Sequence, residues 1–189
     1  MGKKNYKFTI VIPIYNEEAN IYNLYDKISE VCNIYDYKIL FIDDGSIDKS
    51  LKIIKTLSSK NKKIEYISLS KNFGQQQALF AGICHAKGDF VITMDADLQH
   101  PPNVINKMIE KYEEGFEIVQ TIKTGYENIN IIQKIFKKTY YFIFNKISNI
   151  TLPEHSSDFR LITSNAKNVI SKFNEKQKFM RGIIQFIGF

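Results

Sequence analysis

The sequence contains little cysteine, with only Cys32 and Cys84 among its 189 residues. They lie far apart and belong to no paired metal-binding or redox motif, so we expect buried free thiols in a reducing compartment. Long apolar runs are also missing, because no stretch approaches the ~18 residues that span a bilayer. The polar segment Met1–Lys7 shows no signal-peptide pattern. These absences disfavour a secreted disulfide scaffold and predict a cytoplasmic protein.

The glycine-rich loop of nicotinamide dehydrogenases is absent as well. Such enzymes carry Gly-x-Gly-x-x-Gly directly after their first strand. Here the first strand-like run, Phe8–Ile12, is followed by Pro13-Ile14-Tyr15-Asn16-Glu17. A dehydrogenase is therefore disfavoured. Internal repeats and low-complexity segments are missing too, and the chain length suits one sizeable domain.

Strand-like and helix-like segments alternate along the chain. Residues 16–32 place apolar side chains at helical spacing, and Asp48 can cap a second helix that follows it. Residues 75–86, small and apolar, are expected to form a third helix, and Pro101-Pro102 suits the first turn of a fourth over 101–114. Residues 177–189 are apolar and basic. Strands separated by helices of this length predict an α/β fold with a mainly parallel central sheet, helices on both faces and a C-terminal amphipathic helical region. The expected strands are Phe8–Ile12, Tyr37–Ile42, Ile64–Leu69, Phe90–Met94, Phe116–Ile122 and Ser157–Thr163.

Polar clusters follow each of the first four expected strands. They are Tyr15-Asn16-Glu17, Asp43-Asp44, Asn72-Phe73-Gly74 and Asp95-x-Asp97. Because parallel strands end at one edge of a sheet, where ligands bind, we expect these clusters to converge. The last pair offers the oxygen ligands that Mg²⁺ and Mn²⁺ prefer, with positions left for substrate phosphates. Alone it would suit a solvated turn equally well, and its context favours a metal–diphosphate site.

Positive charge is concentrated in the last third of the chain. Residues 1–118 carry 15 Lys and Arg against 16 Asp and Glu, whereas residues 119–189 carry 11 against 4. This asymmetry indicates an anionic partner, and a merely solubilising lysine surface is the alternative. A helix expected over 129–150, with Lys134, Lys137 and Lys138, suits either a membrane surface or ordinary core packing. No motif supports nucleic acid as the partner.

Six motifs occur in one order, and together they are more specific than any one of them. They are Ile12–Glu18, Ile42–Ser46, Asn72–Gly74, Asp95–Pro102, Asp158–Arg160 and Phe179–Gly182. In this order the chain resembles family 2 glycosyltransferases of the GT-A fold, in particular the polyprenyl-phosphate glycosyltransferases, which include dolichyl-phosphate mannose synthases and bactoprenol glucosyltransferases. The resemblance runs from about Phe8 to Phe189.

That resemblance implies an inverting transfer of a hexose from a UDP- or GDP-linked sugar to a polyprenyl phosphate, with Mg²⁺ or Mn²⁺, at the inner face of the cell membrane. Residues 1–122 would form the nucleotide-sugar-binding half. Residues 123–189 would form the acceptor-side region of the same catalytic domain, truncated at the C-terminus, since relatives commonly continue further. UDP is the expected donor nucleotide because the bactoprenol enzymes are the nearest bacterial resemblance.

The resemblance also assigns roles to individual residues. Asp97 and Asp158 are the implied catalytic residues, and helix capping is the alternative role of both Asp43 and Asp44. His100 is expected to be a hydrogen-bonding turn residue and not a ligand. The remaining assignments are Pro13, Tyr15, Glu17, Asp43 and Asp44 for the nucleotide, Asp95, Asp97 and Gln99 for the metal, and Lys123, Lys138 and Arg160 for the acceptor phosphate.

The acceptor decides which chemistry the site needs. A saccharide hydroxyl must lose a proton to a base, whereas a polyprenyl phosphate is already anionic and needs cationic positioning. Asp158 is the candidate base or orienting carboxylate, and Arg160, on the same strand face, is the candidate phosphate ligand. A structural ion pair between them is the alternative. Transfer to a saccharide hydroxyl and a non-catalytic nucleotide-sugar-binding fragment stay open as alternative functions.

Overall fold

The computed structural model describes residues 6–122, 156–175 and 178–189. The helix expected over 129–150 lies outside these residues, as do Lys123, Lys134, Lys137 and Lys138. Their predicted acceptor and membrane roles therefore stay predictions. No helix in the described part of the chain has the length and hydropathy that crossing a bilayer requires.

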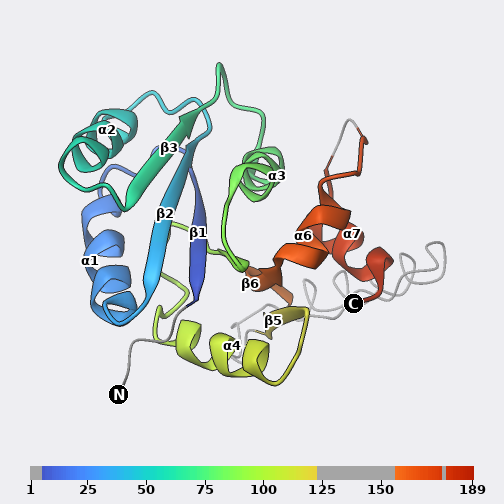
Figure 1. The fold of residues 1–189 in the computed structure, drawn as a ribbon. Helices are drawn as coiled ribbons and strands as arrows, with labels where there is room; N and C mark the ends of the chain where they lie inside the picture. Colours follow the sequence, from blue (N-terminus) through green and yellow to red (C-terminus); the bar gives the residue numbers. More distant parts are fainter. Residues whose placement is uncertain (1–5, 123–155, 176–177) are drawn as a thin grey trace, which may run out of the picture.

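Six strands form one sheet in the order β3-β2-β1-β4-β6-β5 (Figure 1). β1 pairs in parallel with β2 and β4, and β2 pairs in parallel with β3, whereas β6 is antiparallel to both β4 and β5. The mainly parallel sheet is confirmed, and the insertion of β6 between β4 and β5 is a feature that the sequence pattern did not predict. The strands are β1 (Lys7–Ile14), β2 (Asp36–Asp43), β3 (Ile64–Ser68), β4 (Phe90–Thr93), β5 (Ile118–Ile122) and β6 (Ser156–Thr163).

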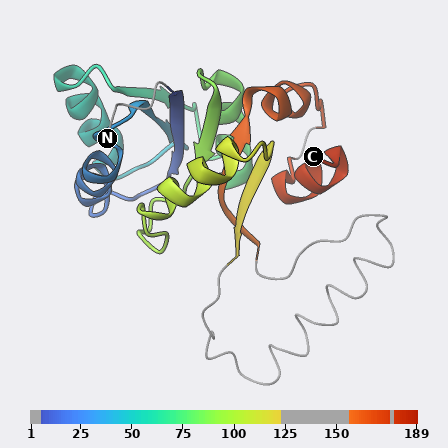
Figure 2. The same cartoon turned by 60° about the horizontal axis from the view of Figure 1, so that its bottom comes forward.

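Helices cover both faces of this sheet, as expected. One apolar cluster joins the sheet to α1, α2 and α4, and a second joins it to α3, α6 and α7. Figures 1 and 2 both show α6 and α7 side by side, beyond α3 and away from α1 and α2. The helices are α1 (Ile21–Cys32), α2 (Ser50–Lys60), α3 (Gln75–His85), α4 (Val104–Glu113), α6 (Ser164–Ile170) and α7 (Met180–Ile187).

Two helices begin later than the sequence predicts. Residues before Ile21 form a loop, in which Asn16 has a left-handed φ of 56°. Before α4, the carbonyls of Pro101 and Pro102 accept backbone hydrogen bonds in a turn, and the helix begins at Val104. In both places the chain first completes a loop at the carboxyl edge of the sheet, which is the edge where ligands are expected.

Gly82 allows helix α3 to pack closely against the sheet. A Cβ at this position would overlap the side chains of Val11 and Ile42. The missing side chain lets the helix backbone approach β1 and β2 directly. As a result, the first turn of α3, with Gln75 and Gln76, stands next to the carboxyl ends of the strands.

The two cysteines differ in their surroundings. Cys32 is free and fully buried, and burial raises the pKa of its thiol to about 12. Cys84 is free and partly exposed. We therefore expect a thiol reagent at mildly alkaline pH to modify one cysteine in the folded chain and two in denaturant, because only the thiolate reacts. The Cys84→Ser variant should show no reaction until it unfolds, and rapid modification of two thiols in the folded protein would contradict the burial of Cys32.

Candidate active site

Hydrogen bonds tie the loops after β1, β2 and β3 to one another. The hydroxyls of Ser46 and Ser50, after β2, accept from the backbone amides of Asn16 and Glu17, after β1, at 3.1 and 2.8 Å. Gly45 has a left-handed φ of 71°, and a Cβ there would meet the backbone of Lys71 at 2.6 Å. The three loops therefore form one connected surface at the carboxyl edge of the sheet.

The paired aspartates after β2 are buried and organise this edge. Asp44, 2% exposed, accepts backbone hydrogen bonds from Phe73 at 2.8 Å and Gly74 at 2.9 Å. Asp43, 1% exposed, accepts from the backbone amide of Ser46 at 3.3 Å and from a serine hydroxyl of β3. Neither carboxylate caps α2, where the amide of Ser50, the first helical residue, donates to Asp48 Oδ1 at 2.9 Å. The alternative role of helix capping is therefore wrong for both, and the nucleotide role stays a prediction.

The other predicted nucleotide residues differ in accessibility. Tyr15 is 46% exposed, which leaves its ring free to stack on a base. Glu17 is half-buried and accepts a hydrogen bond from the side-chain amide of Asn20 at 2.6 Å. Pro13 is buried inside β1, opposite Ile42 of β2. Only the first two therefore present side-chain surface at the loop edge.

Asp95 and Asp97 follow β4 at the same edge and have unequal surroundings. Asp97 is exposed, whereas the Asp95 side chain is 24% exposed and accepts from Gln75 Nε2 at 2.7 Å. Burial raises the pKa of Asp95, and the charges of Asp158 and Asp97 raise it further, while His100 and Gln75 lower it. The half-buried carboxylate is thus held in place by α3, and the exposed one is free to meet a ligand.

These carboxylates suit a hard cation that also binds a diphosphate. No group of three or more His, Cys, Asp and Glu side chains able to hold a metal occurs within residues 6–122, 156–175 and 178–189. Asp95, Asp97 and the exposed amide of Gln99 would supply a partial set of oxygen ligands. Mg²⁺ and Mn²⁺ are commonly held in this way, with substrate phosphates and water completing the coordination. The residues therefore fit a shared metal–substrate site and do not fit a closed protein cage.

His100 is a structural neighbour of this pair. It is 4% exposed, its Nε2 lies 2.6 Å from the Ser157 hydroxyl, and its Nδ1 lies 3.7 Å from Asp95 Oδ2. Its ring packs against that of Phe159, with centroids 5.2 Å apart. The expectation of a hydrogen-bonding residue is confirmed, and the contact fixes β6 against the loop after β4.

Asp158 is brought to this site by the pairing of β6 with β4. Arg160 stands opposite Thr93 in the register, and the Thr93 hydroxyl donates to the backbone carbonyl of Asp158 at 2.5 Å. The Asp158 side chain is only 5% exposed. It lies beside the loop that carries Asp95, and its charge contributes to the raised pKa of that residue. The antiparallel strand thereby adds a further carboxylate to the edge of the parallel sheet.

Four donors surround the Asp158 carboxylate. Oδ1 accepts from Arg160 Nη2 at 2.8 Å and from Arg181 Nε at 3.3 Å. Oδ2 accepts from Arg181 Nη2 at 3.3 Å and from Gln76 Nε2 at 3.2 Å. A carboxylate offers about four lone-pair positions, so each one is engaged.

Arg160 forms the ion pair with Asp158 that the sequence left open as an alternative. It is 1% exposed, and its Nη2 also donates to the Ser157 carbonyl at 2.7 Å. Burial lowers the pKa of Arg160 to about 10, with Asp158 opposing the shift. The side chain of Arg181 is 37% exposed. Of the two, Arg181 is therefore the more accessible to a ligand. Arg181 belongs to the motif Phe179–Gly182, to which the sequence assigned no residue role.

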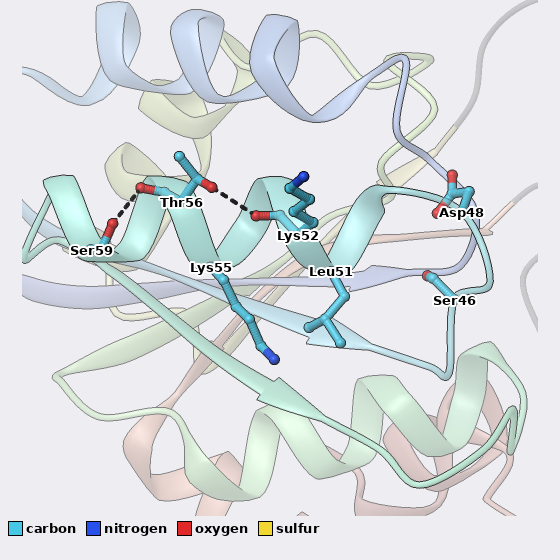
Figure 3. A pocket seen from close by; sticks show the side chains of 7 residues that line it. All are labelled: Ser46, Asp48, Leu51, Lys52, Lys55, Thr56 and Ser59. Carbon is cyan, nitrogen blue, oxygen red and sulfur yellow. Dashed lines mark hydrogen bonds between the residues drawn. The ribbon is translucent and has the colours of Figure 1, made fainter.

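A shallow hollow of about 560 Å³ lies elsewhere, along α2 (Figure 3). Its walls include Lys52, Lys55 and Thr56, and Ser46 and Asp48 stand at one end. No residue of the Asp95–Asp97 segment lines it. The acidic edge of the sheet is therefore the better candidate site.

The model of glycosyl transferase family 2 matches residues 9–167. The chain belongs to this family. Among the curated relatives of this family 2 chain, the putative glycosyltransferase CsbB of Bacillus subtilis is 39% identical over 185 residues, which are 96% of this chain and 55% of CsbB. The bactoprenol glucosyl transferase of Shigella phage SfV is 35% identical over 184 residues, 96% of this chain and 60% of that enzyme. The family 2 chain thus spans less than two thirds of the relatives that it matches.

Solved structures show the same fold. S. aureus TarS, residues 1–349, superposes with a TM-score of 0.62 at 18% identity, over 95% of this chain and 53% of that one. Glucosyl-3-phosphoglycerate synthase from Mycobacterium tuberculosis, in complex with Mn²⁺, UDP and glucosyl-3-phosphoglycerate, superposes with a TM-score of 0.58 at 19% identity. The superposition covers 85% of this chain and 57% of that one. The family 2 chain therefore has the GT-A fold that its motifs imply.

Proposed function

We propose that this chain is the catalytic domain of an inverting, divalent-metal-dependent glycosyltransferase that moves a hexose from a UDP-linked sugar to a polyprenyl phosphate. Membership of family 2 and the bactoprenol glucosyl transferase relative support the class of reaction. The choice of a phosphate acceptor rests on the Asp158 carboxylate, both oxygens of which already accept hydrogen bonds.

A saccharide hydroxyl would need a base with a free lone pair near the donor sugar. Asp158 has both oxygens committed to Arg160, Arg181 and Gln76, so a hydroxyl would have to displace one of these donors. A phosphate acceptor has no proton to give up. We therefore assign Asp158 an orienting role, in which it holds two guanidinium groups for an anionic acceptor.

Transfer of the sugar to a phosphate acceptor requires no proton transfer. An oxygen lone pair of the acceptor phosphate attacks the anomeric carbon of the sugar, and the bond from that carbon to the donor diphosphate breaks with its electron pair on the departing oxygen. Attack from the opposite face inverts the configuration. When bound, the cation offsets the charge of the departing nucleoside diphosphate. Asp95 and Asp97 would hold that cation, and Arg181 would draw the acceptor phosphate toward the anomeric carbon.

On the donor side, Tyr15 would stack on the base and Glu17 would accept hydrogen bonds from base or ribose. Asp44 would act mainly by holding the loop at Phe73 and Gly74 in place, since both of its oxygens accept backbone amides. Pro13 and Asp43, both buried, would support the same loops from below. Lys123 and Lys138 remain candidates for the acceptor phosphate, outside the described residues.

Calorimetric titration of UDP and GDP, with Mn²⁺ and again with a chelator, tests the donor site. We expect UDP to bind with the metal and to lose its affinity with the chelator, because Asp95 and Asp97 alone would repel a diphosphate. GDP is expected to bind more weakly. Equal binding with and without metal would reject the cation site, and preference for GDP would reject the assigned donor.

Two acceptors that differ only in the phosphate test the acceptor site. Undecaprenyl phosphate and undecaprenol share the same lipid chain, so the apolar part of the acceptor is matched. We expect sugar transfer to the phosphate and none to the alcohol, which would require a base. Transfer to the alcohol or to a saccharide would instead support the hydroxyl-acceptor alternative, and nucleotide binding without transfer to any acceptor would favour the non-catalytic one.

A further inference from the structure

Gln76 joins three elements that are distant in the sequence. It lies in the first turn of α3, and its side-chain amide nitrogen donates to Asp158 Oδ2 on β6 at 3.2 Å. Its amide oxygen accepts from the backbone amide of Met180, the first residue of α7, at 3.1 Å. The two halves of one amide group are thus used by two different partners. The half-buried side chain spans the space between the carboxylate and the helix.

The bond from the Met180 amide to Gln76 provides an acceptor at the N-terminus of α7. The first amides of a helix have no intrahelical acceptor and must find one elsewhere. The N-cap residue of α7, Phe179, makes no side-chain capping bond. Gln76 supplies that acceptor from another helix, so it acts as a tertiary cap for Met180.

The next residue of α7, Arg181, also bonds to the Asp158 carboxylate. Arg181 donates to both oxygens of Asp158 from Nε and Nη2. The first turn of α7 is therefore connected to the carboxylate twice, directly through Arg181 and indirectly through Gln76. A shift of this turn would move the guanidinium, and rotation of the carboxylate would break the bond to Gln76.

Apolar packing holds α7 against its neighbours but does not align its first turn with the Asp158 carboxylate. Met180, Ile183 and Ile184 are buried in the cluster shared with α3 and α6. Such contacts are not directional, so they hold the helix against the sheet without fixing the position of its first turn. Gln76 and Arg181 add directional contacts that join this turn to α3 and β6.

We propose that Gln76 is a positioning residue, which aligns the first turn of α7 with the Asp158 carboxylate and so holds Arg181 at the acceptor side of the site. This inference rests on the proposed function in so far as it places Asp158 and Arg181 beside the acceptor. The bridge itself, from Asp158 through Gln76 to Met180, is independent of which acceptor is used.

Three substitutions of Gln76 separate the two bonds. Gln76→Met keeps the length of the side chain and removes both bonds. Gln76→Lys keeps a donor for Asp158 and removes the acceptor for Met180, and Gln76→Glu keeps the acceptor and removes the donor. Gln185→Met is the matched control, because Gln185 lies on α7 and its side chain makes no hydrogen bond with the described residues.

Hydrogen exchange and turnover are measured on the same variants. In Gln76→Met we expect the Met180 amide to exchange about tenfold faster, as when one hydrogen bond is lost. Turnover is followed as UDP release from a UDP-linked hexose in the presence of undecaprenyl phosphate. It should fall on the order of tenfold because the Arg181 guanidinium is misplaced, while UDP affinity should be unchanged. Gln76→Lys and Gln76→Glu should both lower turnover, because each breaks one half of the bridge. Of these two, only Gln76→Lys should also speed exchange of the Met180 amide. Gln185→Met should show neither.

The outcomes are distinguishable. Unchanged exchange in Gln76→Met overturns the bridge, and faster exchange with unchanged turnover overturns the positioning role and leaves a purely structural cap. If the wild-type chain releases no UDP with this acceptor, the proposed function fails. The exchange measurement needs no substrate and still upholds or overturns the bridge.

Discussion

Replacement of Asp97 by Asn is expected to weaken metal-dependent UDP binding by about a hundredfold or more, because removing even a group that supports a metal ligand costs 10–100-fold. The fold should be unaffected, since Asp97 is exposed and, among the described residues, the one hydrogen bond to its carboxylate comes from the nearby Gln99 amide. Titration of UDP with Mn²⁺ and the denaturant midpoint of unfolding measure the two effects separately.

Asp36→Asn is the matched control for this variant. Asp36 is also exposed and begins β2, so it lies at the opposite edge of the sheet from Asp97. The same loss of charge there should leave UDP affinity unchanged. Equal weakening by both substitutions would indicate a long-range effect of net charge, and unchanged affinity in Asp97→Asn would reject the assignment of Asp97 as a ligand.

Replacement of Asp158 by Asn is expected to destabilise the fold by about 3 kcal/mol, the lower end of the cost of breaking a buried ion pair from one side. The Asn side chain has nearly the same shape, so no cavity forms. The charge of Arg160 is then left in a site where it is 1% exposed, with the Ser157 carbonyl as its remaining strong acceptor. The shift in denaturant midpoint, at unchanged m-value, measures the loss.

A double-mutant cycle isolates the ion pair. Arg160→Met removes the buried charge, so the combination of Asp158→Asn with Arg160→Met should be more stable than Asp158→Asn alone. Arg181 keeps water as a partner, because its side chain is 37% exposed. The cycle compares the stability lost through Arg160→Met in the wild-type chain with that lost in the Asp158→Asn variant. If the two losses are equal, the two residues do not form an energetically coupled pair. Sugar transfer should fall in both Asp158 variants while UDP binding is kept.

Much of the fold was predictable because its determinants are local. Each parallel strand is a short apolar run bounded by polar residues, and each helix between strands repeats its apolar positions at 3.6-residue spacing. The strands Phe90–Met94 and Ser157–Thr163 were predicted to within one residue of β4 and β6. Helix α6 was missed because it follows β6 directly, without an intervening turn, and has only seven residues.

Side-chain partners in the site were less predictable, since they join distant parts of the chain. Asp95 and Asp97 were identifiable because their two positions follow one strand. Gln75, which holds Asp95, and Gln76, which holds Asp158, read from the sequence only as polar residues at the start of a helix. Gln76 and Asp158 are 82 residues apart, and no periodicity relates them.

By itself, the sequence determined the alternation of strands and helices, the family, and the gathering of polar loops at the carboxyl edge, because these depend on local pattern and on the rule that parallel strands end together. The tertiary structure decided what faces those loops. β6 enters antiparallel between β4 and β5 and carries Asp158 and Arg160 to the site, and α7 brings Arg181. Strand order and the docking of α7 arise from burial and pairing between segments far apart in the chain, which no local pattern encodes.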